Sequence, residues 1–207
     1  MKSDELILAS ASPRRKKLLA QVGLNFKTDR ADIDESKIAE ENAQEYVLRL
    51  SQEKAGVVGQ RYKHGIILAA DTTVVLGGDV LGKPESETHG VEMLRRLSGN
   101  AHQVVTGVTV LNRSRQESFL TSSIVIFREI SMSEITWYWK TGEPLDKAGA
   151  YGLQGKGAAF VSAIHGSFTN VIGLPLAETL SLLQEFDVNA MKVRANETPP
   201  AQVDEYV

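Results

Sequence analysis

Four side chains that can bind an anion are crowded into the segment SASPRR, residues 10–15. The segment follows an apolar run typical of a short buried strand and begins a helical pattern. A helix N-terminus offers unpaired backbone N–H groups and a positive dipole, which arginines in the first turn oppose. A sequence selected only for helix stability would carry acidic residues there, so the arginines indicate a site for an anion such as phosphate. The four side chains are Ser10, Ser12, Arg14 and Arg15.

A carboxylate, Asp71, interrupts a strand pattern. The apolar run IILAA precedes it and the run TTVVL follows it. A carboxylate in buried strand sequence is unfavourable unless it is paired or binds a metal. The alternative is that a strand ends here and the aspartate caps a turn. We favour a functional role, because strand-forming residues continue beyond it.

Three more charged residues are weaker candidates. Lys54 lies on the apolar stripe of a predicted helix, where it either runs along the edge of the core, the commoner case, or points into a cleft. Lys83 follows a predicted hairpin that starts beside Asp71, so this loop can return to the same cleft, although loop lysines are usually only solvated. Glu35 follows Asp34 in an acidic loop. Acidic loop residues are usually only exposed, but a carboxylate pair offers the oxygen ligands that a hard divalent cation prefers.

A glycine-rich segment, residues 146–157, reads DKAGAYGLQGKG. Glycines let a backbone approach a ligand closely, but the spacing matches neither a P-loop nor a dinucleotide-binding motif. Gln154 lies between glycines, and its amide can both donate to and accept from a base edge. The alternative is an ordinary loop with one polar residue.

The elements that must position these groups form an α/β pattern with a mixed sheet, because helices alternate with strands and hairpins also occur. Glycines at 77 and 78 mark the turn of the hairpin after Asp71. The predicted helices begin at Pro13 and span 42–58, 88–98, 131–142 and 175–186. The predicted strands span 6–9, 66–70, 102–112, 117–130 and 158–164, and the hairpin covers the segment after Asp71.

The composition bounds the function more broadly. The chain has 207 residues, a net charge of −3 and no cysteine, which excludes disulfides and thiolate metal sites and gives no general attraction to nucleic acid or membrane. No secretion signal or membrane-spanning run is visible, so we expect a cytoplasmic protein. We expect one domain over residues 1–190 and a poorly ordered polar tail over 191–207.

Taken together, the cations suit a polyphosphate and the carboxylates suit a divalent metal and a water. LILASASPRRKKLL, AADTTVVLGGDVLGKP, SGNAHQVVTGV, GEPLDKAGAYGLQGKGAAFV and NVIGLPLAET resemble the Maf family of nucleoside triphosphate pyrophosphatases over roughly residues 5–187. The resemblance implies a two-lobed fold similar to inosine triphosphatases, with a central cleft, and hydrolysis between the α and β phosphates.

The resemblance also implies roles for individual residues. Asp71 would be the general base and would share a Mg²⁺, Mn²⁺ or Co²⁺ ion with Glu35, while Thr72 and Gln154 would select the base. A homodimer is a further expectation from the family. The residues expected to hold the phosphates of the nucleoside triphosphate are Ser10, Ser12, Arg14, Arg15, Lys54 and Lys83.

Within the family, the chain resembles the branch that acts on dTTP and UTP, which carries Arg, Thr and Gln at the positions of Arg14, Thr72 and Gln154. The branch resembling 7-methyl-GTP pyrophosphatases carries Trp, Gln and Glu there, and all three differences disfavour that activity. A third hypothesis is a nucleotide-dependent regulator of septum formation, because Maf relatives are linked to division arrest. The presence of every charge needed for hydrolysis speaks against regulation as the sole role.

Overall fold

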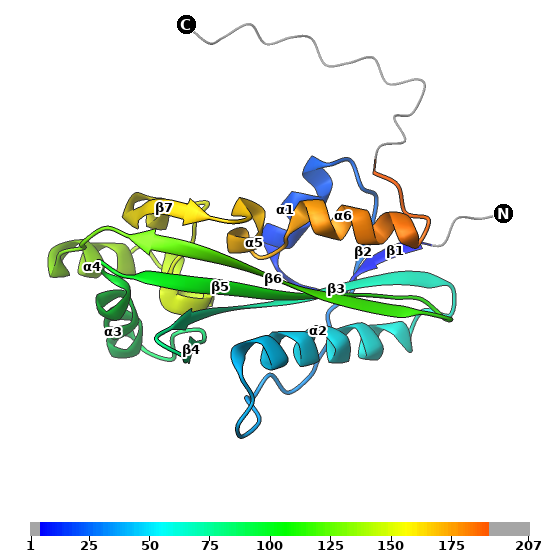
Figure 1. Ribbon diagram of the computed structural model, residues 1–207, viewed down its shortest axis with the longest axis horizontal. Helices are drawn as coiled ribbons and strands as arrows, with labels where there is room; N and C mark the ends of the chain where they lie inside the picture. Colours follow the sequence, from blue (N-terminus) through cyan, green and yellow to red (C-terminus); the bar gives the residue numbers. More distant parts are fainter. Residues whose placement is uncertain (1–4, 191–207) are drawn as a thin grey trace, which may run out of the picture.

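The computed structural model describes residues 5–190 and contains one mixed sheet with helices on both faces (Figure 1). The strand order is β2-β1-β3-β5-β6-β7, and β4 pairs with the C-terminal part of β3. β1 runs parallel to β2 and β3, and every other pairing is antiparallel. The strands are β1 (Glu5–Leu8), β2 (Lys27–Thr28), β3 (Gly65–Leu76), β4 (Asp79–Leu81), β5 (Ala101–Leu111), β6 (Gln116–Phe127) and β7 (Val161–His165).

The helices begin where capping residues allow it. Ser12 caps α1 by accepting a hydrogen bond from the Arg15 N–H, and Pro13 occupies the first helical position, as the sequence predicts. Ser131 and Glu134 form the predicted capping box of α4. The α-helices are α1 (Pro13–Gln21), α2 (Ala43–Gly59), α3 (Glu87–Leu97), α4 (Met132–Trp139), α5 (Phe168–Ile172) and α6 (Leu176–Glu185), and the short 3-10 turns are η1 (Glu143–Asp146), η2 (Ala148–Ala150) and η3 (Lys156–Phe160).

The near-continuous apolar runs of β1 and β3 follow from burial on both faces of the sheet. Alternate residues such as Leu8 and Leu68 pack toward α1 and α6, while Ile7 and Ile67 pack toward α2. A second core surrounds Phe127 at the other end of the long strands, beneath α3 and α4. The predicted α/β class with a mixed sheet is therefore confirmed (Figure 1). The core is divided into separate clusters along the sheet.

Helix α2 lies unusually close to the centre of the sheet. A Cβ atom on Gly107 of β5 would lie only 2.5 Å from the Val47 carbonyl oxygen. Glycine at this position thus allows the α2 backbone to approach β5, and this places the inward face of α2 beside the middle of β3.

Several predicted boundaries shift. The strand predicted over 66–70 continues to Leu76, and the strand predicted over 117–130 ends at Phe127. The strand predicted over 158–164 begins at Val161, because residues 156–160 form the turn η3. Pro175 is the N-cap of α6 rather than part of its first turn. The short elements β2 and α5 are absent from the sequence prediction, and the predicted tail over 191–207 lies outside the described residues. Among residues 5–190, no helix combines the length and hydrophobicity needed to cross a membrane.

Candidate active site

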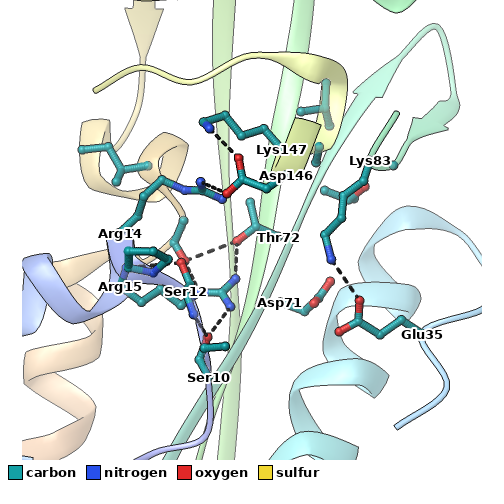
Figure 2. A pocket seen from close by; sticks show the side chains of 18 of the residues that line it. Ser10, Ser12, Arg14, Arg15, Glu35, Asp71, Thr72, Lys83, Asp146 and Lys147 are labelled. Atoms are coloured by element: carbon teal, nitrogen blue, oxygen red, sulfur yellow. Dashed lines mark hydrogen bonds and ion pairs between the residues drawn. The ribbon is translucent and has the colours of Figure 1, made fainter. Parts of the chain in front are cut away.

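A cleft of about 830 Å³ opens between the start of α1, the middle of β3 and two loops (Figure 2). Its volume lies in the range of small-molecule sites. All the residues that the sequence singles out line it, although they come from positions 10 to 154 of the chain. These residues are Ser10, Ser12, Arg14, Arg15, Glu35, Lys54, Asp71, Thr72, Lys83 and Gln154.

Arg15 is held at the base of the cleft by three oxygen acceptors. Its Nε donates to the Gly173 carbonyl at 2.8 Å, and its two terminal nitrogens donate to Ser10 Oγ at 3.2 Å and Thr72 Oγ1 at 3.0 Å. Burial lowers the pKa of Arg15, and the charge of Asp71 opposes that effect. A guanidinium fixed in this way is a preorganised partner for a phosphate.

Arg14 bridges the cleft to a segment far away in the sequence. Its Nη1 lies 3.1 Å from Asp146 Oδ2 in η1, and Asp146 is also paired with Lys147 (Figure 2). Burial acts to raise the pKa of Asp146, but Lys147 and Arg14 outweigh it, so the pKa lies below its ordinary value. Arg14 therefore faces the cleft with a carboxylate partner that a phosphate oxygen can replace.

Lys54 connects the two carboxylates of the site. Its Nζ lies 2.6 Å from Asp71 Oδ1 and 2.7 Å from Glu35 Oε1, and its side chain is buried. Lys54 thus points into the cleft and not along the edge of the core. Lys83 reaches the other Glu35 oxygen at 3.3 Å. Burial acts to raise the pKa of Glu35, but Lys54 and Lys83 together hold it below its ordinary value.

The loop that carries Glu35 is fixed from α2. Tyr46 Oη donates to the Glu35 carbonyl at 2.9 Å, and Arg49 donates to the Ser36 carbonyl at 3.1 Å and to the Glu41 carboxylate at 2.7 Å. Burial, together with the negative charges of Asp71 and Glu35, raises the pKa of Tyr46 to about 12. The acidic loop is therefore ordered against the helix that also supplies Lys54.

The two residues expected to select the base differ in their surroundings. Thr72 Oγ1 accepts from Arg15, lies 2.9 Å from Thr106 Oγ1 and lies 3.3 Å from the Gly173 carbonyl. Its hydroxyl therefore supports Arg15, and selection of the base by Thr72 stays a prediction. Gln154 is exposed in the loop between η2 and η3 and lines the cleft.

Three groups of the site are absent from the sequence-based candidates. The Gly173 carbonyl holds Arg15, and the side chains of Asp146 and Lys147 lie opposite Arg14. Asp146 and Lys147 belong to the glycine-rich segment, so their position in a motif was a usable signal. The carbonyl of Gly173 carries no side-chain signal at all, because any residue has a carbonyl.

The residues fit a divalent cation of the kind that binds partly through its substrate. Glu35 and Asp71 approach the same Lys54 nitrogen, so both carboxylates can reach a common point. Among residues 5–190 no three acidic or histidine side chains form a complete cage. Mg²⁺ commonly uses one or two carboxylates and completes its shell with water and phosphate oxygens.

The fold and the cleft define an α/β protein in which cations at a helix N-terminus and two carboxylates line one cleft. Residues 5–186 match the family described as Maf-like protein. The chain therefore belongs to the Maf-like protein family.

Curated relatives in this family cover nearly the same span. The chain is 50% identical over 186 residues to a dTTP/UTP pyrophosphatase of Myxococcus xanthus, covering 89% of this chain and 94% of the relative. It is 48% identical over 183 residues to a dTTP/UTP pyrophosphatase of Vibrio vulnificus, covering 88% of this chain and 98% of the relative.

Solved structures are more distant. The Ham1 protein of Staphylococcus aureus aligns with a TM-score of 0.42 and 14% identity, covering 60% of this chain and 72% of that chain. Protein VC0702 of Vibrio cholerae aligns with a TM-score of 0.38 and 8% identity, covering 68% of this chain and 78% of that chain. Both TM-scores lie below 0.5.

Proposed function

We propose that the chain is a nucleoside triphosphate pyrophosphatase that hydrolyses dTTP and UTP to the nucleoside monophosphate and diphosphate, and so removes nucleotides from the cellular pool. The observation that carries the proposal is the convergence of Arg14, Arg15 and the pair Lys54–Asp71 on one cleft. Two relatives named dTTP/UTP pyrophosphatase, which are 50% and 48% identical to this chain, support dTTP and UTP as its substrates.

Asp71 is the proposed general base. It accepts a proton from a water whose oxygen forms a bond to the α-phosphorus, while the bond from that phosphorus to the bridging oxygen breaks and diphosphate leaves. Arg14, Arg15 and Lys83 neutralise the charge that develops on the departing oxygens, with Ser10 and Ser12 as hydrogen-bond donors. Lys54 holds Asp71 in place, because its Nζ lies 2.6 Å from that carboxylate.

Glu35 and Asp71 are the residues that would hold a divalent cation, and the cation would supply further neutralisation of phosphate charge and a more acidic bound water. Gln154 is the proposed reader of the base. Its amide can donate to O4 and accept from the N3–H of a uracil-type base, whereas an ionised glutamate cannot donate to that carbonyl. The cytoplasmic location and the homodimer stay predictions from the sequence.

A panel of nucleoside triphosphates tests the proposal. The purified chain is incubated with dTTP, UTP, CTP, ATP, GTP or 7-methyl-GTP in the presence of Mg²⁺, Mn²⁺ or Co²⁺, and the products are separated by anion-exchange chromatography. We expect diphosphate and monophosphate in equal amounts, with dTTP and UTP preferred. Release of orthophosphate alone, or a preference for 7-methyl-GTP, would contradict the proposal.

A further inference from the structure

The loop that carries Gln154 is anchored by a carboxylate outside the cleft. Glu143 accepts hydrogen bonds from the backbone N–H groups of Lys156, at 2.8 Å, and Gly157, at 3.1 Å. The two contacts use different oxygens of the carboxylate. Glu143 is not among the residues that line the cleft, so it acts on a bound nucleotide through the residues that it holds and not by direct contact.

Tyr138 secures the other end of the same loop. Its hydroxyl donates to Glu143 Oε1 at 2.9 Å and accepts from the Gly152 N–H at 3.1 Å. Glu143 and Tyr138 therefore hold the backbone on both sides of Gln154. The bonded N–H groups belong to Gly152 before it and to Lys156 and Gly157 after it. Tyr138 is fully buried and packs edge-on against Phe160, so the anchor is part of the second core.

The loop fits tightly against this anchor. A Cβ atom on Gly155 would lie 2.4 Å from Glu143 Oε2, and a Cβ atom on Gly157 would lie 2.6 Å from the Tyr138 hydroxyl. Glycines at these positions thus let the backbone approach the two polar groups. Burial acts to raise the pKa of Glu143, but the bonds from Lys156, Gly157 and Tyr138 and the charge of Lys147 outweigh it and keep the carboxylate ionised.

We propose that Glu143 is a positioning residue for base selection. It fixes the loop so that the Gln154 amide can meet the Watson–Crick edge of a bound pyrimidine. The inference rests on the proposed function. It assigns selectivity to the pair Glu143–Tyr138 as well as to Gln154, since a loop free to shift would present the amide to several bases. The phosphate-binding side chains lie on other elements, and of these Arg14 alone contacts η1, through Asp146 and not through the Glu143 carboxylate.

Glu143→Gln is the informative variant. A carboxylate accepts at both oxygens, but glutamine presents one acceptor and one NH₂ group, so one of the two backbone N–H groups faces a donor. The resulting loss of one hydrogen bond should reduce the preference for UTP over ATP in kcat/KM by about tenfold. Hydrolysis of inorganic tripolyphosphate, which has no base, should stay within about twofold of wild type.

Matched variants separate positioning from stability. Glu134→Gln removes another carboxylate that accepts backbone and side-chain bonds, in the capping box of α4 far from Gln154 in the chain, and should keep wild-type selectivity. Gln154→Ala removes the proposed reader and should lose selectivity as Glu143→Gln does. Tyr138→Phe removes one hydroxyl with little change in packing and should also reduce the preference for UTP. This variant keeps the inference testable if Glu143→Gln does not fold.

Amide hydrogen exchange gives a readout that does not depend on turnover. In Glu143→Gln, exchange should quicken at Lys156 and Gly157 and remain unchanged along α2. Wild-type selectivity in Glu143→Gln, or an equal loss on UTP and tripolyphosphate, overturns the inference while the proposed function stands. A wild-type chain without any preference for UTP overturns the proposed function instead, and unchanged exchange at these amides overturns the anchor itself.

Discussion

Burial of His102 makes the stability of the folded protein depend on pH. The ring is 2% exposed, its Nε2 lies 2.8 Å from the Tyr151 hydroxyl, and Phe127 packs edge-on against it at 4.9 Å. Burial lowers its pKa from 6.5 to about 4, and the Asn100 backbone offsets only part of this effect. The folded protein therefore keeps His102 neutral at a pH where the unfolded chain protonates it.

The direction of this pH dependence follows from the number of protons that each state binds. Between pH 6.5 and 4 the unfolded state binds more protons, so acid favours unfolding, and the stability present at pH 7 is lost as the pH falls through this window. For a single group with these two pKa values, the free energy of unfolding falls by about 2 kcal/mol between pH 7 and pH 5.

Urea unfolding at pH 7 and pH 5 measures this effect. Other groups also titrate, so the comparison is with His102→Gln, which removes the titration and can still hydrogen-bond to Tyr151. We expect the variant to be less stable at pH 7, because of poorer packing, but to lose about 2 kcal/mol less than wild type on acidification. An equal loss in both proteins would refute the reasoning that burial keeps this ring neutral.

Two further substitutions test the packing and charges that build the cleft. Gly107→Ala places a Cβ atom 2.5 Å from the Val47 carbonyl oxygen and should destabilise the fold by about 1–3 kcal/mol in urea unfolding, whereas Gly56→Ala, in open space on α2, should be neutral or stabilising. Equal effects in the two variants would exclude a special role for the close approach of α2. Lys54→Met leaves two neighbouring carboxylates without their shared cation and should cost roughly 2 kcal/mol, less than a fully buried pair because Glu35 is 44% exposed. Wild-type stability and turnover in that variant would show that Lys54 has neither role.

Local chemistry made much of the fold predictable. Ser12 followed by Pro13 fixes the start of α1, and Gly77 followed by Gly78 fixes the turn after β3, because each depends only on backbone geometry that those residue types favour. The start of β7 was less predictable. Residues 156–160 turn instead of extending, and the turn begins where the amides of Lys156 and Gly157 bond to Glu143, thirteen and fourteen residues earlier in the chain.

The candidate site was predictable as a set of residues but not as a network of contacts. Arginines at a helix start and a carboxylate within a strand were each unusual enough to single out. The sequence could not indicate that Arg14 meets Asp146, 132 residues later, or that Lys54 meets two carboxylates at once. Such pairings depend on how the loops cross the sheet, and single-residue preferences contain no information about that path.

The central claim, that Asp71 activates the attacking water while the cations hold the triphosphate, is tested most directly by Asp71→Asn. Asparagine keeps the shape of the side chain and removes its basicity, and Lys54 retains Glu35 as a partner. Asp79→Asn, on the exposed hairpin, is the matched control. The account predicts that Asp71→Asn binds a non-hydrolysable UTP analogue as wild type does but turns over UTP about 10²–10⁴-fold more slowly, with the control unaffected. Near-normal turnover in Asp71→Asn would contradict it.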